Sequence, residues 1–393
     1  MSIASFKTAP TGAVPSASDP IKVMVVDDAV VVRGLVGRWI AEESDMTLVA
    51  SHRSGRDAVA DIARKMPDVV ILDIEMPDMD GLTALPLIIA AKRDVMVLMA
   101  STLTRRNAEI SLKCLSLGAA DYVPKPETNA GVTTSSVFKR EILDKVRALG
   151  RRRKIAGRAF RAAAPAIATN APRVSAPSLA PQSIGFNDAG FKLRPFGTTV
   201  PKVLLLGSST GGPQALTTVL KALGSLVDRV PVLITQHMPP TFTTILAEHA
   251  AKAAGRPAAE GKDGEPIVAG RIYVAPGAKH MVVKKTGGST VIHLEDGPPI
   301  NFCKPAVDPL FTSAAQAWGA QTFACVLTGM GHDGAHGAGD IVAAGGSVIA
   351  QDEATSVVWG MPGAVAQAGH ASAVLPIDQI APKIVRIFAG DRS

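Results

Sequence analysis

The sequence predicts an α/β protein with two doubly wound parallel-sheet domains in tandem, joined by a flexible linker. Two observations support this prediction. In both halves of the chain, short runs of Val, Ile and Leu alternate with helical patterns, as expected when buried parallel strands are connected by helices. Between the halves lies an Arg-, Ala- and Pro-rich stretch with too little apolar periodicity to form a core, which is typical of a flexible spacer.

Four segments follow from these patterns. Residues 1–20 form a Ser-, Ala- and Pro-rich tail, 21–147 the first domain, 148–196 the linker and 197–393 the second domain. The tail lacks the apolar stretch of a secretory signal. No apolar run approaches the about 20 residues that a membrane-spanning helix requires, so we expect a cytoplasmic protein without a transmembrane segment.

The net charge of +7 does not indicate a nucleic-acid-binding protein. Residues 147–195 hold ten Lys or Arg residues and one Asp, so this segment alone carries +9 and the rest of the chain is slightly acidic. A basic tether attracts anionic surfaces weakly, but neither domain is itself basic. We therefore expect no specific nucleic-acid partner.

The three cysteines, Cys114, Cys303 and Cys325, show neither metal-ligand spacing nor a disulfide pattern. Each has apolar or small neighbours, which predicts a small core residue. On this interpretation no cysteine belongs to a catalytic site, and thiol reagents should have little direct effect on activity.

The first domain alternates strands and helices from its beginning. Its predicted strands are Lys22–Val26, Leu48–Ala50, Val69–Leu72, Val95–Ala100 and Tyr122–Val123. Helical patterns lie between them, for example Val30–Glu42 and Asn107–Leu117. In such a parallel sheet the ligand site lies at the carboxyl ends of the strands.

Chemically useful residues follow four of these strands: Asp27 and Asp28, Asp73, Ser101 and Lys125. A single Asp after a strand is usually a helix N-cap or a turn residue, but the recurrence at four strand ends favours a shared site. Crowded carboxylates require a hard cation such as Mg²⁺. Asp73 is then placed to attack a phosphoryl group, with Lys125 and Ser101 binding its oxygens.

At these positions the chain resembles the receiver domains of two-component systems. The resemblance covers residues 20–147 and rests on Asp27-Asp28, Leu72–Pro77, Asp80-Gly81, Ser101, and Tyr122 three residues before Lys125-Pro126. It implies a flavodoxin-like fold and phosphorylation of Asp73 by a chemotaxis histidine kinase. It also implies Mg²⁺ held by Asp28, Asp73 and the Glu75 carbonyl with Asp27 nearby, and a switch through Ser101, Tyr122 and Lys125.

The second domain repeats the α/β pattern. Its predicted parallel strands are Val203–Leu206, Val230–Thr235, Phe323–Leu327 and Ser347–Ala350. Its predicted helices are Pro213–Leu223, Phe242–Ala254, Pro309–Trp318 and Gly339–Ala344. A small antiparallel insertion is predicted at Arg271–Val274, Met281–Lys284 and Val291–Leu294.

Ser209 lies in a Gly-x-Ser-x-Gly turn between a predicted strand and the helix that begins at Pro213. Small neighbours allow such a turn to project the hydroxyl. Phosphate-binding turns and ordinary glycine turns have a similar sequence, so this pattern alone does not identify a nucleophile. A dinucleotide site needs an acidic residue at the end of the second strand, where this chain has His237. No Gly-x-x-x-x-Gly-Lys-Ser/Thr loop for a nucleotide triphosphate occurs.

His237 and Asp333 add a base and an orienting carboxylate at two further strand ends. Each alone could be structural, a buried histidine or a turn-forming aspartate. With Ser209 they match the chemistry of serine hydrolases, in the chain order Ser–His–Asp. Common α/β-hydrolases run Ser–Asp–His, so we expect a different fold. The glycine-rich turn at Met330 offers unhindered amides for an oxyanion hole.

Four segments resemble the catalytic domain of chemotaxis protein-glutamate methylesterases: Gly207–Gly212, Ile234–Pro240, Ala275–Met281 and Leu327–Gly334. The resemblance covers residues 197–390 and, with the receiver, the whole architecture. It implies a Rossmann-like serine hydrolase without a cofactor, with the triad Ser209, His237 and Asp333 and an oxyanion contact from the Met330 amide. The implied substrate is a glutamate methyl ester on chemoreceptors, and many members also deamidate receptor glutamines.

Two alternatives belong to other classes of protein. A DNA-binding response regulator would carry a helix-turn-helix effector, whereas this domain is strand-rich and not basic. A non-catalytic adaptor would lack a triad member, and all three are present. We also predict that phosphorylation of Asp73 relieves obstruction of the Ser209 site, and that activity rises as His237 loses its proton near a pKa of about 6.5.

Overall fold

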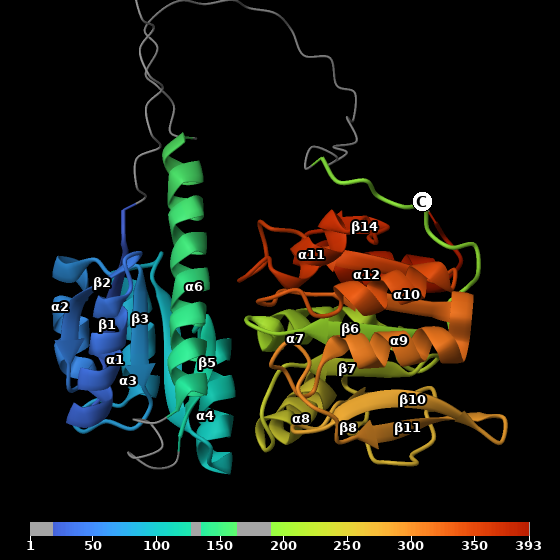
Figure 1. Cartoon of the computed structure of the whole chain (residues 1–393), viewed down its shortest axis with the longest axis horizontal. Helices are drawn as coiled ribbons and strands as arrows, with labels where there is room; N and C mark the ends of the chain where they lie inside the picture. The colour runs from blue at the N-terminus through green and yellow to red at the C-terminus, as the bar shows by residue number, and fades with distance from the viewer. Residues whose placement is uncertain (1–18, 127–134, 163–189, 393) are drawn as a thin grey trace, which may run out of the picture.

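The computed structural model describes residues 19–126, 135–162 and 190–392. The described chain forms two α/β domains that lie side by side (Figure 1). The predicted fold class, two tandem parallel-sheet domains, is confirmed. Among the described residues, no helix is both long and apolar enough to cross a membrane.

A five-stranded parallel sheet forms the first domain, in the order β2-β1-β3-β4-β5. The strands are β1 (Ile21–Val26), β2 (Met46–His52), β3 (Val69–Asp73), β4 (Met96–Thr102) and β5 (Asp121–Lys125). The helices are α1 (Val30–Glu42), α2 (Gly55–Lys65), α3 (Gly81–Ala91), α4 (Arg105–Ser116) and α6 (Ser136–Ala162). The strand order reverses between β1 and β3, and the carboxyl ends at such a switch point are the expected ligand site.

The last helix of this domain, α6, runs past the boundary that we predicted at residue 147. Residues 148–162, assigned to the linker from their composition, continue the helix, because the Arg- and Ala-rich sequence also has high helix propensity. Residues 163–189 of the predicted linker, and the tail to residue 18, lie outside the described residues.

A seven-stranded parallel sheet forms the second domain, in the order β14-β13-β12-β6-β7-β9-β8. The strands are β6 (Val203–Ser208), β7 (Val232–Gln236), β8 (Ala258–Glu260), β9 (Ile272–Val274), β12 (Thr322–Val326), β13 (Ser347–Gln351) and β14 (Ala373–Leu375). The helices are α7 (Gly212–Leu223), α8 (Phe242–Ala254), α9 (Val307–Trp318), α10 (Ala335–Ala343), α11 (Met361–Gln367) and α12 (Ile377–Phe388), with short 3₁₀ turns at Gly224–Leu226 and Gly319–Gln321.

The predicted antiparallel insertion is partly wrong. Only β10 (His280–Thr286) and β11 (Ser289–Glu295) form an antiparallel hairpin. The third segment, β9, joins the main sheet in parallel between β7 and β8. Its three residues are fully buried, as is typical of a strand covered on both faces.

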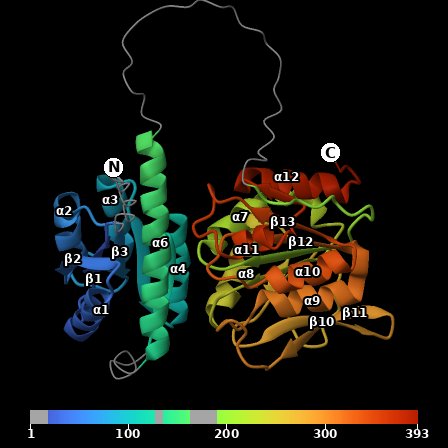
Figure 2. The same ribbon diagram turned by 45° about the horizontal axis from the view of Figure 1, so that its top comes forward.

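The two domains meet along α4 and α6 of the first domain (Figures 1 and 2). Buried apolar residues form one continuous cluster from β5 and α4 into α7 and α8. Polar contacts flank this cluster: Gln214 donates to the Ala119 carbonyl at 2.8 Å, and Arg105 pairs with Glu248 at 2.9 Å. The receiver-like domain is therefore packed directly against the second domain.

Candidate active site

The three predicted catalytic residues follow adjacent strands of the second sheet. Strand β6, which leads to Ser209, lies between β7, which leads to His237, and β12, which precedes Asp333. Parallel pairing aligns the carboxyl ends of these strands, with Ser208 opposite Gln236. The sheet therefore brings Ser209, His237 and Asp333 to the wall of one pocket.

The turn that carries Ser209 is held tightly at both sides. The Ser209 amide donates to the Thr328 carbonyl at 3.0 Å, and Gly211 adopts a left-handed φ of 76°. At Gly212 a Cβ atom would lie 1.9 Å from Oε1 of Gln236. Only glycine permits this close approach, so the small residues around Ser209 have a steric cause.

Gln236 connects the nucleophile turn to the histidine turn, and sequence reasoning did not single it out. Its Oε1 accepts from the Ser208 hydroxyl at 2.7 Å. Its Nε2 donates to the carbonyls of Ser209 at 2.9 Å and His237 at 3.1 Å. One amide side chain thus fixes the spacing of the two turns.

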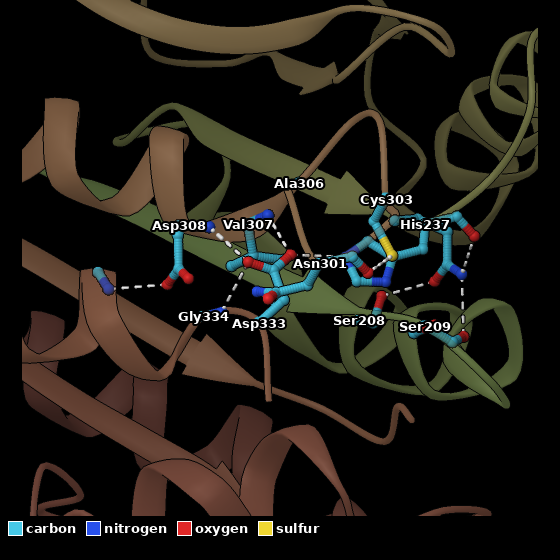
Figure 3. A network of polar contacts seen from close by, with 12 residues as sticks. Ser208, Ser209, His237, Asn301, Cys303, Ala306, Val307, Asp308, Asp333 and Gly334 are labelled. Atoms are coloured by element: carbon cyan, nitrogen blue, oxygen red, sulfur yellow. Dashed lines mark hydrogen bonds and ion pairs between the residues drawn. The ribbon is translucent and has the colours of Figure 1, made fainter. Parts of the chain in front are cut away.

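Asp333 holds the imidazole of His237 through a bond of 2.6 Å from Nε2 to Oδ2. The carboxylate also accepts from the amides of Val307 at 2.6 Å, Asp308 at 3.0 Å and Gly334 at 3.0 Å (Figure 3). Burial raises the pKa of Asp333, but the bonds from His237 and these amides outweigh it and lower the pKa. Asp333 is therefore an ionised group that orients the ring.

The other ring nitrogen of His237, Nδ1, has no hydrogen-bond partner within the described residues. Beside it lies the thiol of Cys303 (Figure 3). Burial lowers the pKa of His237, yet the hydrogen bond to Asp333 and the neighbouring Cys303 outweigh burial and raise the pKa to about 10. The prediction of an ordinary histidine pKa is therefore wrong for this arrangement.

The prediction that all three cysteines are core residues is also wrong for Cys303. Cys114 and Cys325 are buried, whereas Cys303 is half-buried and lines the pocket with Ser209 and His237. The loop that carries Cys303 is distant from Ser209 and His237 in the sequence and reaches their pocket only in the folded structure. Its local apolar neighbours therefore gave no sign of this position.

Met330 also lines the pocket, beside the turn between β12 and α10. The preceding amide, that of Gly329, donates to the Val358 carbonyl at 2.9 Å. No acceptor for the Met330 amide is found in the described part of the chain. An amide without a protein acceptor is the kind of donor that an oxyanion hole requires.

The first domain forms the other wall of this pocket, which has a volume of about 710 Å³. Residues of β5 and α6 line it, including Tyr122, Val137 and Arg140. The guanidinium of Arg140 lies 3.6 Å from the ring centroid of Phe302, a cation–π contact. Access to Ser209 is therefore limited by α6.

A second polar site lies at the carboxyl ends of β1 and β3. Oxygens of Asp27, Asp28 and Asp73 lie within 4.8 Å of one another. Nζ of Lys125 lies 2.7 Å from Oδ2 of Asp27 and 2.7 Å from Oδ1 of Asp73. The structure thus brings together four of the five side chains that the sequence placed here, whereas the hydroxyl of Ser101 contacts that of Ser111.

The electrostatics of this cluster favour an added cation. Burial, which outweighs the attraction of Lys125 and acts together with the neighbouring Asp27, raises the pKa of Asp73 to about 6. Burial lowers the pKa of Lys125, but the two carboxylates outweigh burial and raise it. Three hard oxygen donors with one ammonium between them fit Mg²⁺, and the acidic cluster is typical of the Mg²⁺ site of receiver domains.

The other two predicted switch residues, Ser101 and Tyr122, are buried. The hydroxyl of Ser101, at the end of β4, lies 2.9 Å from the hydroxyl of Ser111 on α4. Tyr122 is buried against the second domain. Glu75 is exposed beside Asp73. The structure thus places a carboxylate cluster and a Ser–His–Asp pocket in two contacting domains, an arrangement typical of a receiver-linked serine hydrolase.

Comparison with known proteins agrees with this class. Residues 204–384 match the CheB methylesterase family and residues 23–135 the response regulator receiver domain. A protein-glutamate methylesterase/protein-glutamine glutaminase of the group 2 operon from Rhodopseudomonas palustris is 60% identical, over 95% of this chain and 96% of its own length. A protein with the same description from Bradyrhizobium diazoefficiens is 57% identical over the same shares.

Among solved structures, the CheB methylesterase catalytic domain of Thermotoga maritima is 38% identical. It covers 48% of this chain and 100% of its own length, with a TM-score of 0.46. The identity and coverage of the full-length relatives show the family. The chain belongs to the chemotaxis protein-glutamate methylesterase/protein-glutamine glutaminase family, with a receiver domain ahead of the catalytic domain.

Proposed function

We propose that Ser209, His237 and Asp333 perform the methylesterase reaction of this family. His237 accepts the Ser209 proton as the hydroxyl attacks the ester carbonyl, and Asp333 stabilises the imidazolium. The Met330 amide binds the oxyanion. Methanol leaves, and water hydrolyses the glutamyl-enzyme. The observation that supports this best is the 2.6 Å bond between His237 and Asp333 next to the Ser209 turn.

The same residues account for glutaminase activity. An amide attacked by Ser209 gives the same glutamyl-enzyme with ammonia as the leaving group, and the catalytic domain needs no cofactor for either reaction. The substrates are glutamate methyl esters and glutamines on chemoreceptors. Mass spectrometry of receptor peptides from cells with wild-type protein or Ser209→Ala tests this: receptor methyl esters should persist with the variant.

The receiver domain accepts a phosphoryl group on Asp73 from a chemotaxis histidine kinase. Asp28, Asp73 and the Glu75 carbonyl hold Mg²⁺, with Asp27 nearby, and the ion supplies charge neutralisation for phosphoryl transfer. Lys125 and Ser101 bind the transferred oxygens. Support comes from the carboxylate cluster and the two 2.7 Å contacts of Lys125. Asp73→Asn should abolish incorporation of phosphate from a small-molecule phosphodonor.

Phosphorylation of Asp73 activates the esterase by relieving obstruction of the Ser209 site. The contact of Arg140 with Phe302, at 3.6 Å, lies at the pocket wall that the first domain supplies. Movement of Ser101 and Tyr122 toward the phosphorylated site would weaken this packing. A change of a few kcal/mol in the docking free energy is enough to alter the open population strongly.

The functional units are residues 21–147 and 197–393, preceded by the tail 1–20 and joined by the linker 148–196. The helix α6 of the first unit extends beyond residue 147, to Ala162. The protein acts in the cytoplasm, where a histidine kinase phosphorylates its receiver. Because the effector is a seven-stranded sheet in which Ser209, His237 and Asp333 line one pocket, we do not favour a DNA-binding or non-catalytic effector.

A further inference from the structure

Cys303 is fixed beside the catalytic histidine by its loop. The amides of Ile300 and Cys303 each donate to the other residue's carbonyl, at 3.0 and 2.8 Å. Asn301 and Phe302 between them adopt left-handed φ values of 50° and 64°. This tight turn presents the thiol to the pocket, where Sγ lies 3.5 Å from the Asn301 carbonyl (Figure 3).

His237 provides a polar partner aimed at this thiol. The His237 side chain is only 9% exposed, and its Nδ1 has no hydrogen-bond partner in the described residues. Figure 3 shows the sulfur of Cys303 next to that side of the ring. The ionised Asp333 on the opposite nitrogen favours the imidazolium form of the ring. The unpartnered Nδ1 can accept the Cys303 thiol proton as the sulfur reacts, which generates the nucleophilic thiolate beside an imidazolium that Asp333 stabilises.

We propose that Cys303 is a modification site for hydroperoxides, and that its oxidation to a sulfenic acid reversibly silences the esterase. The Cys303 thiolate attacks one peroxide oxygen, an S–O bond forms and the O–O bond breaks. Sulfur loses two electrons and the peroxide gains them. The leaving hydroxide takes the proton of the His237 imidazolium, so the products are a sulfenic acid, water and neutral imidazole.

Silencing follows from where the added oxygen lies. The sulfenic acid places a hydrogen-bonding oxygen beside Nδ1 of His237, the nitrogen that must accept the Ser209 proton. The base is then engaged and the space for the substrate ester is reduced. A small thiol reverses the change, because it forms a mixed disulfide with loss of water and a second thiol releases Cys303. The loss of esterase activity rests on the proposed role of His237, whereas the detection of an added oxygen on Cys303 does not depend on that role.

The test uses the full-length chain treated with hydrogen peroxide. We expect wild-type protein to lose most of its esterase activity while peptide mass spectrometry finds one added oxygen, trapped by a sulfenic-acid reagent, at Cys303. Dithiothreitol should restore the activity. Methionine sulfoxides do not revert with a simple thiol, so recovery separates Cys303 from the methionines near the site.

Cys303→Ala and Cys303→Ser are the test variants, and each is compared with its own untreated activity. Both should resist peroxide, whereas Cys114→Ala and Cys325→Ala, which change buried thiols, should remain as sensitive as wild type. The proposal is overturned if Cys303 gains no oxygen, if the oxidised enzyme keeps its activity, or if the Cys303 variants are inactivated to the same degree. Labelling of Cys303 is detectable even in Ser209→Ala, so failure of this proposal differs from failure of the proposed triad.

Discussion

Tyr122 of the receiver domain stacks on Phe242 of the catalytic domain, with ring centroids 4.6 Å apart and an angle of 6° between the planes. Tyr122 lies on β5, and Phe242 begins α8, shortly after His237. Both side chains are buried. The residue that the receiver resemblance implicates in switching is thus in direct contact with the element next to the catalytic base.

Phe242→Leu should therefore raise the activity of the unphosphorylated enzyme and reduce its stimulation by a phosphodonor. Leucine keeps an apolar side chain but loses the stacked pair, whose contribution is about 0.5–1.5 kcal/mol. Ester hydrolysis with and without phosphodonor measures both effects. Unchanged resting activity in a variant that remains folded by circular dichroism would show that this contact does not restrain the enzyme.

Ser209→Ala should reduce ester hydrolysis to background without unfolding the protein. The hydroxyl is the proposed nucleophile, whereas its contribution to packing is small. Ser208→Ala is the matched control: it removes the 2.7 Å bond to Gln236, worth about 1 kcal/mol, and should leave measurable turnover. If Ser209→Ala keeps near wild-type activity while Ser208→Ala loses it, the nucleophile is Ser208.

The pH dependence of hydrolysis should have its acidic limb above the usual histidine range of about 6.5. Burial lowers the pKa of His237, but Asp333 and Cys303 outweigh it and raise the pKa to about 10. Since the base must be neutral to accept a proton, a raised pKa moves the limb to higher pH. Cys303→Ala should move the limb back toward lower pH, and an identical profile for both proteins would exclude the influence of Cys303.

Strand ends were the part of the site that the sequence could predict. Short apolar runs mark β1, β3, β6, β7 and β12, and the turns that follow them carry the polar residues to one edge of each parallel sheet. Cys303 and Gln236 could not be predicted in the same way. Their roles depend on which loop approaches His237 and on one side chain bridging two turns, and neither relationship leaves a local pattern.

For the linker, the sequence contains a local pattern, but this pattern fits two different structures. A basic, alanine-rich stretch is typical of a flexible spacer and also of an exposed helix. In the structure its first part continues α6, and Arg152 donates to the Glu353 carbonyl of the second domain at 3.3 Å. The competing preference wins where the helix has already begun and its next turns contact another domain.

Removal of the receiver domain should relieve the obstruction of Ser209. The fragment 197–393 should hydrolyse esters faster than the unphosphorylated full-length protein, because it lacks α6 and the Arg140 contact with Phe302. A tether maintains an appreciable effective concentration of the receiver, so a weak interface is sufficient to obstruct the site in the full chain. Full-length Asp73→Asn should hydrolyse esters at the same rate with and without the phosphodonor.

Arg140→Ala tests the same contact without removing a domain. An exposed or partly desolvated cation–π pair contributes about 0.5–2 kcal/mol, so resting activity should rise by up to about thirty-fold if the contact holds the domains closed. Arg38→Ala, on α1 of the receiver and away from the pocket lining, is the matched control and should leave resting activity unchanged. If neither the fragment nor Arg140→Ala is faster than resting wild type, the receiver does not obstruct Ser209, and phosphorylation acts by stimulating the catalytic domain or by recruiting receptors.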